Sequence, residues 1–332
     1  MTAMPTKLRW GVLSTANIGL KKVIPAMQLG EYTTIAAIAS RNLAKAQEAA
    51  KALNIPTAYG SYEELLADPN IDAIYNPLPN QLHVPWTARA AEAGKHVLCE
   101  KPMATSVAEC ESMIAACKSA GVKLMIAYRC HYEPTNLRAV SLIRSGALGQ
   151  VQAIESSFGF NQVLGEWRLD KKMAGGGSLV DVGIYSLNAC RYLTGEEPEK
   201  FAAFASTIDH DGRFATVEEN LSWTMRFPSG IVASCNTTYG ADMDGYFKVH
   251  GSKGWMEASP AFNYDGLHLY AEYADTHLDE PNPAHDPYQF QAQADHFSHC
   301  IQNGLEPKTT GEEGLRDMGY IAEIYRAAGI AS

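Results

Sequence analysis

The sequence has no run of apolar residues long enough to cross a membrane, which takes about 18 without interruption. No apolar segment of signal-peptide type follows Lys7 and Arg9, because a strand-like stretch comes directly after them. Basic residues are few: 27 Lys and Arg stand against 37 Asp and Glu, and the net charge of −10 would repel a phosphate backbone. We therefore expect a cytoplasmic protein that binds neither membranes nor nucleic acid.

The seven cysteines include no C-x-x-C pair, and most lie among apolar neighbours, which is typical of reduced thiols in a core. The chain also lacks low-complexity tracts. Its 332 residues, 46% of them hydrophobic and 19% charged, are enough for two domains with buried cores. These features exclude a disulfide-stapled miniature scaffold, a fibre and a disordered chain.

Through about residue 127, short apolar runs alternate with amphipathic stretches. Five runs have the composition of strands, at residues 8–13, 34–39, 73–75, 96–99 and 123–127. The stretches between them carry apolar residues at helical spacing, at residues 43–53, 62–66, 84–93 and 107–120. Such alternation builds a parallel sheet with crossover helices, so we predict an α/β fold with a doubly wound Rossmann domain over residues 1–128.

Residues 129–332 have longer apolar stretches that are rich in β-branched and aromatic residues. Strands are predicted at residues 151–160, 219–227 and 231–239, and helices at residues 138–143, 178–193, 288–301 and 312–328. We predict a C-terminal α+β domain with a large, mainly antiparallel sheet, whose last helix could pack back on the first domain. An open sheet face needs cover, so we expect a homodimer or homotetramer formed through this sheet.

The first strand contains Gly11 and leads into a helix near Gly19, where a dinucleotide-binding fold places its pyrophosphate turn. Two of the usual glycines are replaced by Ser14 and Ala16, but small residues still let backbone amides approach a diphosphate. We predict cofactor contacts at Ser14, Thr15, Ala16, Asn17 and Ile18. Taken alone, this turn fits a plain strand–turn–helix equally well.

The end of the second predicted strand favours NADP over NAD. An NAD-binding fold carries an acidic residue there for the ribose 2′-hydroxyl, whereas this chain has Ser40 and Arg41, with Lys45 one helical turn later. A hydroxyl and two cations suit a 2′-phosphate. In the alternative interpretation, Arg41 only caps a solvated helix start.

Polar residues gather in three later segments, at residues 75–83, 99–102 and 177–185. The first two follow predicted strands, so they lie at the carboxyl edge of the sheet, where ligands bind. In the third, Asp181 and Tyr185 are four residues apart on a predicted helix and share one face.

Six segments resemble a known family: residues 100–107 (EKPMATSV), 128–132 (YRCHY), 166–169 (EWRL), 174–179 (AGGGSL), 181–185 (DVGIY) and 311–314 (GEEG). It is the glucose-fructose oxidoreductase, inositol dehydrogenase and rhizopine-catabolism (GFO/IDH/MocA) family, and the resemblance extends from Arg9 to about Ala328. Many members have His where this chain has Tyr185. The phenol therefore indicates the sugar-oxidoreductase branch, which includes glucose-fructose oxidoreductase.

The resemblance implies an oxidoreductase with NADP, which could be tightly bound, acting on small sugars. One aldose would be oxidised at C1 to the aldonolactone, and a second sugar would be reduced to the alditol with the same cofactor. It implies catalytic roles for Tyr185, Lys101 and Asp181, and substrate contacts from these three residues together with Arg129 and Phe160. It also implies that cofactor contacts come from Asn76, Pro77, Leu78, Asn80, His83, Glu100, Lys101, Arg129, Trp167, Arg168 and Tyr288.

The chemistry of these side chains agrees with those roles. Oxidation at an anomeric carbon requires removal of a hydroxyl proton as hydride leaves. A phenol such as Tyr185 gives up its proton more readily beside a cation, for which Lys101 is the candidate. Asp181 would accept a hydrogen bond from the sugar and orient it.

Other interpretations stay open. Lys101 could be a surface lysine, Asp181 could pair with Arg191, and the ring of Tyr185 could fill the core. The protein could also be an ordinary NADP-dependent aldose 1-dehydrogenase that releases NADPH, or a non-catalytic NADP-sensing regulator. His296 and His299 have helical spacing that could suit a metal, but no third ligand lies nearby in the sequence, and we predict no metal site.

Overall fold

The structure is a computed structural model that describes residues 6–282 and 288–330. It divides into two compact units, the first formed by Met1–Tyr132 with Asp286–Leu315 and the second by Glu133–His285 with Arg316–Ser332. The predicted boundary at residue 128 lies close to the division after Tyr132. The sequence pattern did not predict that residues 286–315 return to the first unit. The last helix, predicted as one that could pack back on the first domain, is divided between the two units after Leu315.

The first unit is built on a six-stranded parallel sheet with the order β3-β2-β1-β4-β5-β6. Its strands are β1 (Leu8–Leu13), β2 (Thr33–Ala39), β3 (Thr57–Tyr59), β4 (Ala73–Asn76), β5 (His96–Cys99) and β6 (Leu124–Ile126). The strand order reverses between β1 and β4, and at such a point the crevice at the carboxyl ends of the strands is free to bind a ligand. This confirms the Rossmann prediction.

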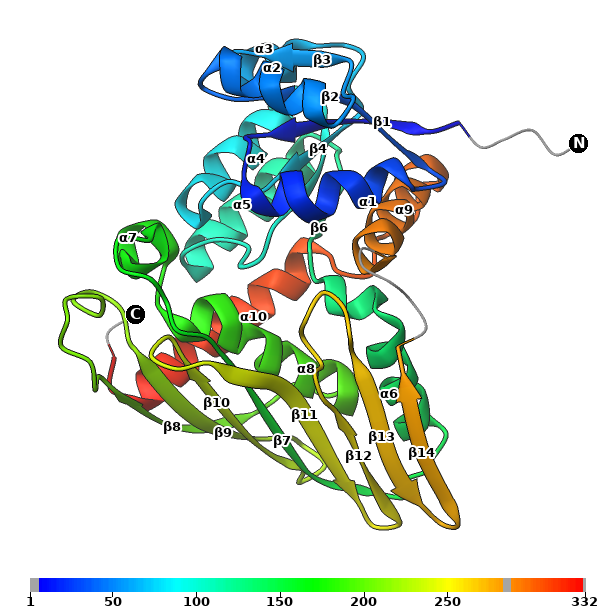
Figure 1. Ribbon diagram of the computed structural model, residues 1–332, viewed down its shortest axis with the longest axis vertical. Coiled ribbons are helices and arrows are strands. Elements are labelled where there is room, and N and C mark those ends of the chain that lie inside the picture. The colour runs from blue at the N-terminus through cyan, green and yellow to red at the C-terminus, as the bar shows by residue number, and fades with distance from the viewer. Residues whose placement is uncertain (1–5, 283–287, 331–332) are drawn as a thin grey trace, which may run out of the picture. The chain divides into compact units, whose positions relative to one another are not determined.

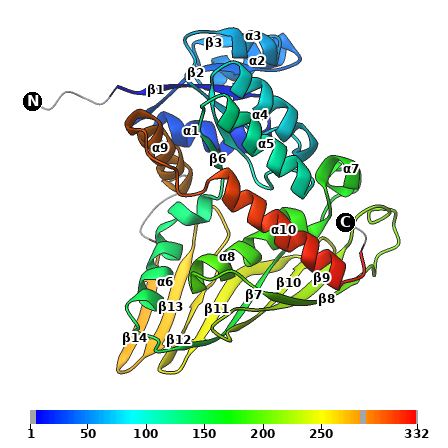
Figure 2. The same ribbon diagram turned by 180° about the vertical axis from the view of Figure 1, so that it is seen from behind.

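Helices cover both faces of this sheet. They are η1 (Gly19–Val23), α1 (Ile24–Gln28), α2 (Leu43–Ala52), α3 (Tyr62–Ala67), η2 (Asn80–Leu82), α4 (His83–Glu92), α5 (Val107–Ser119), η3 (Arg129–Tyr132) and α9 (Tyr288–Asn303). In Figures 1 and 2, α1 and α9 lie on one face of the sheet and α4 and α5 on the other. The helix starts follow local chemistry, since Ser61 and Ser106 each accept a backbone hydrogen bond as N-caps.

Helix α9 belongs to the first unit because its apolar side completes the core there. The ring of Phe297 lies 5.9 Å from that of the fully buried Trp10, and the Trp10 indole nitrogen donates to the hydroxyl of Ser298 at 3.1 Å. Packing between two aromatic rings of this size accounts for a chain that leaves the unit at residue 132 and returns to it more than 150 residues later.

The second unit contains an eight-stranded sheet with the order β14-β13-β12-β11-β7-β10-β9-β8. Its strands are β7 (Val151–Gly159), β8 (Lys200–Ser206), β9 (Asn220–Arg226), β10 (Val232–Thr238), β11 (Met243–Gly251), β12 (Gly254–Ala258), β13 (His268–Tyr273) and β14 (Thr276–Pro281). All neighbours are antiparallel except β7 and β10, which are parallel. The prediction of a mainly antiparallel sheet is therefore confirmed.

One face of this sheet is covered by helices, and the other is open, as the two views show (Figures 1 and 2). The helices of the unit are α6 (Pro134–Arg144), η4 (Trp167–Leu169), α7 (Lys171–Ala174), η5 (Leu179–Gly183), α8 (Ile184–Thr194) and the later part of α10 (Gly311–Ala327). Residues alternate along the strands, so that Ile154, Val249 and Met256 are buried under the helices. The predicted helix over residues 178–193 starts with one wide, π-type turn, η5, before α8.

Among the described residues, no helix is both long and apolar enough to span a bilayer.

A buried ion-pair network ties α10 to α8 within the second unit. The side chain of Arg191 is 4% exposed, and its guanidinium contacts the fully buried carboxylate of Asp317 at 2.6 Å. The same guanidinium contacts the carboxylate of Glu197, which is partly exposed, at 2.6 Å. The other oxygen of Asp317 accepts from the amide of Asn188 at 2.9 Å. Asp181 is therefore not the partner of Arg191, and that interpretation is wrong.

Replacing Asp317 with alanine leaves the Arg191 charge buried with only one of its two carboxylates. We expect a loss of about 3–5 kcal/mol in the free energy of unfolding, measured with urea at pH 7. The control is Glu199→Ala, which removes an exposed ion pair with Arg226 and should change stability by less than about 1 kcal/mol. Equal effects of the two substitutions would contradict this account.

Candidate active site

The turn after β1 lacks two of the usual glycines of a dinucleotide-binding loop, but it contains a residue in the left-handed backbone region. Ser14 has a φ of +76°, in the region that glycine normally occupies. Its amide donates to the carbonyl of Ala39 at 2.9 Å, and its hydroxyl accepts from the amide of Ala16 at 3.3 Å. A serine thus makes the turn that the sequence motif assigns to glycine, and Thr15, Asn17 and Ile18 continue it toward η1.

The predicted phosphate-recognition residues lie at the end of β2. Ser40 is buried, whereas Arg41 and Lys45 are exposed beside it. The cap of α2 is Asn42, whose side chain accepts from the amide of Lys45 at 3.2 Å. Arg41 is therefore not the cap of α2. The end of β2 is followed by two cations, Arg41 and Lys45, and carries no acidic residue.

A hydrogen-bonded network joins the loops after β4 and β5. The side-chain amide of the buried Asn76 donates to the carbonyl of His83 at 3.1 Å, and its oxygen accepts from the amide of Leu78 at 3.4 Å. The Glu100 amide donates to the Asn76 carbonyl at 3.1 Å. Pro77 lies beside the first helical turn after β1, because a Cβ on Gly19 would be 3.9 Å from its ring.

His83 connects the two loops from the interior. Its Nδ1 lies 2.9 Å from the carbonyl of Pro102 and its Nε2 lies 2.7 Å from the carbonyl of Leu78. Complete burial lowers the pKa of the imidazole from 6.5 to about 4, although these carbonyls favour its charged form. The contacts of His83 are thus to the loops that would surround a cofactor.

Glu100 and Lys101 follow β5. Burial raises the pKa of the Glu100 carboxyl, and the hydroxyl of Tyr75, which donates to it at 2.7 Å, opposes that rise. The other oxygen of Glu100 accepts from the amide of Lys101 at 3.3 Å. The side chain of Lys101 is partly exposed, and Asn80, at the start of η2, is buried.

Arg129 and the start of α9 come together although they are distant in the sequence. The buried Arg129 guanidinium donates to the side-chain oxygen of Gln289 at 2.7 Å and lies 5.9 Å from the ring centre of Phe290. Tyr288, the first residue of α9, is 44% exposed next to this pair. Gln289 was missed by the sequence analysis, because only the fold brings it to Arg129.

In the second unit, Asp181 is held by two donors. The buried hydroxyl of Tyr239 donates to Oδ2 of Asp181 at 2.8 Å, and Nε of Arg168 lies 3.1 Å from the same oxygen. Burial and the nearby Asp181 charge raise the pKa of Tyr239 well above its ordinary value, so this phenol keeps its proton. Arg168 also stacks on Trp167, with 4.6 Å from its guanidinium carbon to the ring centre.

Tyr185 lies one helical turn after Asp181 and is partly exposed. Its ring packs edge-on against Phe158, with 5.5 Å between the ring centres, and tilted against Phe262, with 5.8 Å. Aromatic side chains therefore flank the phenol. Phe160 is partly exposed too, with its ring 5.3 Å from that of Tyr239. Tyr239 had no sequence signal, since it lies 58 residues from Asp181.

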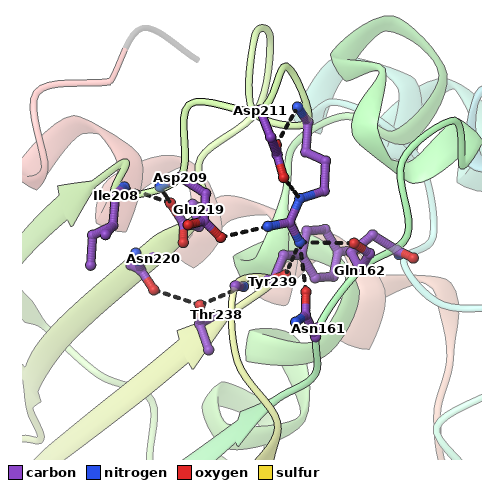
Figure 3. Close-up of polar contacts among 11 residues, drawn as sticks. Asn161, Gln162, Ile208, Asp209, Asp211, Glu219, Asn220, Thr238 and Tyr239 are labelled. Atoms are coloured by element: carbon purple, nitrogen blue, oxygen red, sulfur yellow. Dashed lines mark hydrogen bonds and ion pairs between the residues drawn. The ribbon is translucent and has the colours of Figure 1, made fainter.

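Figure 3 shows polar contacts at the ends of β7 and β10, where Asn161, Gln162 and Tyr239 lie. One guanidinium, that of Arg213, donates to the side chain of Asn161 at 2.6 Å and to the carbonyls of Gln162 and Tyr239 at 2.9 and 3.4 Å. It is neutralised by Asp209 and Asp211. These contacts fix the backbone that carries Phe160 and Tyr239.

His296 and His299 do not form a metal site with other ligands in the described part of the chain, which contains no group of three or more suitable side chains. Nε2 of His296 accepts from the amide of Lys308 at 2.9 Å. His299 packs against the ring of Tyr32 at 5.6 Å.

The low pKa of His83 predicts acid sensitivity. The imidazole is neutral in the folded protein at pH 5 and protonated in the unfolded chain, so its contribution to stability is complete above pH 6.5 and is lost as the pH falls toward 4. We expect the free energy of unfolding to fall by about 2 kcal/mol between pH 7 and pH 5 from this residue. Urea unfolding of His83→Gln should show a fall smaller by that amount, and an unchanged fall would contradict the assignment.

Comparison with known proteins gives two family models and several full-length relatives. Residues 8–128 match the model of an oxidoreductase family with an NAD-binding Rossmann fold, and residues 136–257 match the GFO/IDH/MocA C-terminal domain. The chain is 38% identical to D-xylose 1-dehydrogenase (NADP(+)) 2 of Haloferax volcanii, over 97% of each chain. It is 32% identical to trans-1,2-dihydrobenzene-1,2-diol dehydrogenase of Danio rerio, over 96% of this chain and 94% of that protein.

Among solved structures, the chain is similar to aldose-aldose oxidoreductase from Caulobacter crescentus, crystallised with glycerol. The identity is 42%, the TM-score is 0.92, and the match covers 97% of this chain and 98% of that chain.

Proposed function

The chain belongs to the GFO/IDH/MocA family of oxidoreductases, and we propose that it oxidises an aldose at C1 to the aldonolactone with NADP. The observation that carries this proposal is the pair formed by Asp181, a carboxylate fixed by two donors, and Tyr185, a partly exposed phenol one turn later on the same helix. Together they offer a group that can orient a sugar hydroxyl and a group that can move its proton.

Two kinds of evidence support NADP. The Haloferax relative is named as an NADP(+) enzyme. In this chain, the small residues of the turn at Ser14 would leave room for a diphosphate, and the exposed Arg41 and Lys45 would bind a 2′-phosphate. When bound, the cofactor accepts the hydride from the sugar carbon.

The residues around it would act as follows. Lys101 would bind a sugar hydroxyl, and its charge would favour the phenolate of Tyr185 if both groups contact the same sugar. Tyr185 takes the proton of the anomeric hydroxyl, and Asp181 accepts a hydrogen bond from another sugar hydroxyl. Asp181 is not the base, because Arg168 and Tyr239 already stabilise its charge.

We further propose that a second aldose or ketose is reduced to the alditol by the same bound cofactor. The structural similarity to an aldose-aldose oxidoreductase supports this cycle, since it has 42% identity over nearly the whole chain. The similarity to a D-xylose 1-dehydrogenase supports the alternative, in which NADPH is released after one oxidation.

We also propose that the open face of the second unit's sheet pairs with another copy of the chain. Its residues are already arranged in ion pairs and stacked groups: Glu155 with His250, and Lys248 with Glu257 and over the ring of Trp255. Such a self-compensated surface can be buried without leaving single charges unpaired.

Purified protein incubated with NADP and glucose or xylose should increase the absorbance at 340 nm, because the nicotinamide is reduced. Denaturing the protein as purified and identifying the released dinucleotide separates the two cycles. Stoichiometric NADP supports retention between two sugars, whereas an empty protein supports the ordinary dehydrogenase. No spectral change with any aldose would contradict the enzyme and favour a cofactor-sensing regulator.

Tyr185→Phe removes the proton carrier and keeps the ring that packs against Phe158. We expect turnover to fall by about 100-fold or more while NADP affinity stays within about twofold of wild type. The matched control is Tyr273→Phe on β13, with expected turnover near wild type. Turnover near wild type in Tyr185→Phe would mean that another group moves the proton.

A further inference from the structure

The three consecutive glycines at residues 175–177 are explained by close packing and not by a bound ligand. Gly175 ends α7 with a φ of +87°, which favours glycine. A Cβ on Gly176 would lie 2.2 Å from the hydroxyl of Tyr325, and a Cβ on Gly177 would lie 2.4 Å from the carbonyl oxygen of Glu218. Both glycines therefore allow Glu218, two residues before β9, and Tyr325 of α10 to approach the backbone before η5.

This approach places a carboxylate against the start of the helix. The Glu218 side chain, 9% exposed, accepts from the amide of Gly177 at 3.0 Å and from the amide of Leu179 at 2.9 Å. The hydroxyl of Tyr325 donates to the same carboxylate at 2.9 Å. The first amides of a helix have no partner within it, so Glu218 satisfies donors that would otherwise be lost in the interior.

A second contact fixes the same turn from the sheet. The hydroxyl of Thr237 on β10 donates to the carbonyl of Phe158 at 2.9 Å and lies 3.3 Å from the carbonyl of Ser178, and a Cβ on Gly183 would lie 3.1 Å from the Thr237 methyl group. The turn is thus held at its amides by Glu218 and packs closely against Thr237. Asp181 and Tyr185 follow directly, two and six residues after Leu179.

We propose that Glu218, held by Tyr325, is a positioning residue that sets where Asp181 and Tyr185 meet the sugar. This inference rests on the proposed function, because it gives those two side chains their roles. Glu218 does not touch the substrate. It acts by fixing the register of the helix that carries both groups, and a displacement of about 1 Å there is enough to cost about 100-fold in rate.

The next residue provides a matched control. Glu219 is also buried, and its carboxylate also accepts two backbone amides, those of Ile208 at 2.6 Å and Asp209 at 2.9 Å (Figure 3). Its partners belong to the loop before β9 and not to the helix of Asp181. Glu218→Gln and Glu219→Gln are therefore the same chemical change in neighbouring residues. The first weakens contacts to the start of the Asp181 helix, and the second weakens contacts to the loop before β9.

The experiment compares Glu218→Gln, Tyr325→Phe and Glu219→Gln with wild type in the full chain. In Glu218→Gln the new NH₂ group faces backbone N–H donors. We expect kcat to fall about 10- to 100-fold, the KM for xylose to rise several-fold, and the Kd for NADP to stay within about twofold. Tyr325→Phe removes one donor of three and should give the same pattern with a smaller change. Glu219→Gln should leave kcat and KM within about threefold of wild type.

Hydrogen exchange followed by mass spectrometry gives a measurement that does not depend on activity. Peptides that cover residues 177–185 should exchange faster in Glu218→Gln, and peptides that cover residues 207–210 should do so in Glu219→Gln. If Glu218→Gln does not fold, Tyr325→Phe carries the comparison.

Three results would overturn the inference. The first two are unchanged exchange at residues 177–185 and equal kinetic losses in the Glu218 and Glu219 variants. A loss of kcat in Glu218→Gln with an unchanged KM for xylose would also do so, because a smaller folded fraction explains it. A wild-type protein that oxidises no aldose would defeat the proposed function instead, and the exchange comparison would still decide whether Glu218 fixes this helix.

Discussion

A carboxylate taken out of water needs donors or a cation, and this requirement organises the second unit. The carboxylate of Asp181 accepts a hydrogen bond from Tyr239 and pairs with Arg168. The carboxylate of Glu218 accepts from two backbone amides at the start of the helix and from Tyr325. The carboxylate of Asp317 accepts from an arginine and an asparagine. Each set of partners comes from another element. The helix that begins at η5 is consequently held by these polar contacts as well as by its apolar face. The surroundings of Asp181 and Tyr185 on this helix are therefore fixed.

In the first unit, buried polar side chains are paired mainly with backbone groups. Asn76 and His83 form hydrogen bonds with carbonyls and amides of the loops after β4 and β5, and the carboxylate of Glu100 accepts from a tyrosine hydroxyl. Such contacts make loops rigid without using a second set of charged side chains. Lys101 directly follows Glu100 in this hydrogen-bonded surrounding, which suits the substrate contact that we propose for it.

Much of the fold could be predicted because its signals are local. Buried parallel strands are short apolar runs, and all five predicted ones overlap β1, β2, β4, β5 and β6 within one residue at either end. The strands β3, β8 and β11 to β14 were missed, because β3 is brief and the others are only partly buried, so their composition differs little from that of loops. The wide turn η5 was missed because hydrophobic spacing does not distinguish it from an ordinary helical turn.

The sequence by itself determined the fold class and the absence of an acidic residue after β2, and it predicted a turn after the first strand and a common face for Asp181 and Tyr185. All of these depend on residues within a few positions of each other, where spacing and backbone geometry are enough. Only the tertiary structure decided the partners of those groups: Tyr239 lies 58 residues from Asp181, and Tyr325 lies 107 residues from Glu218. The physical reason is that a hydrogen bond is set by distance and direction between atoms, and the folding of the whole chain brings such distant atoms together.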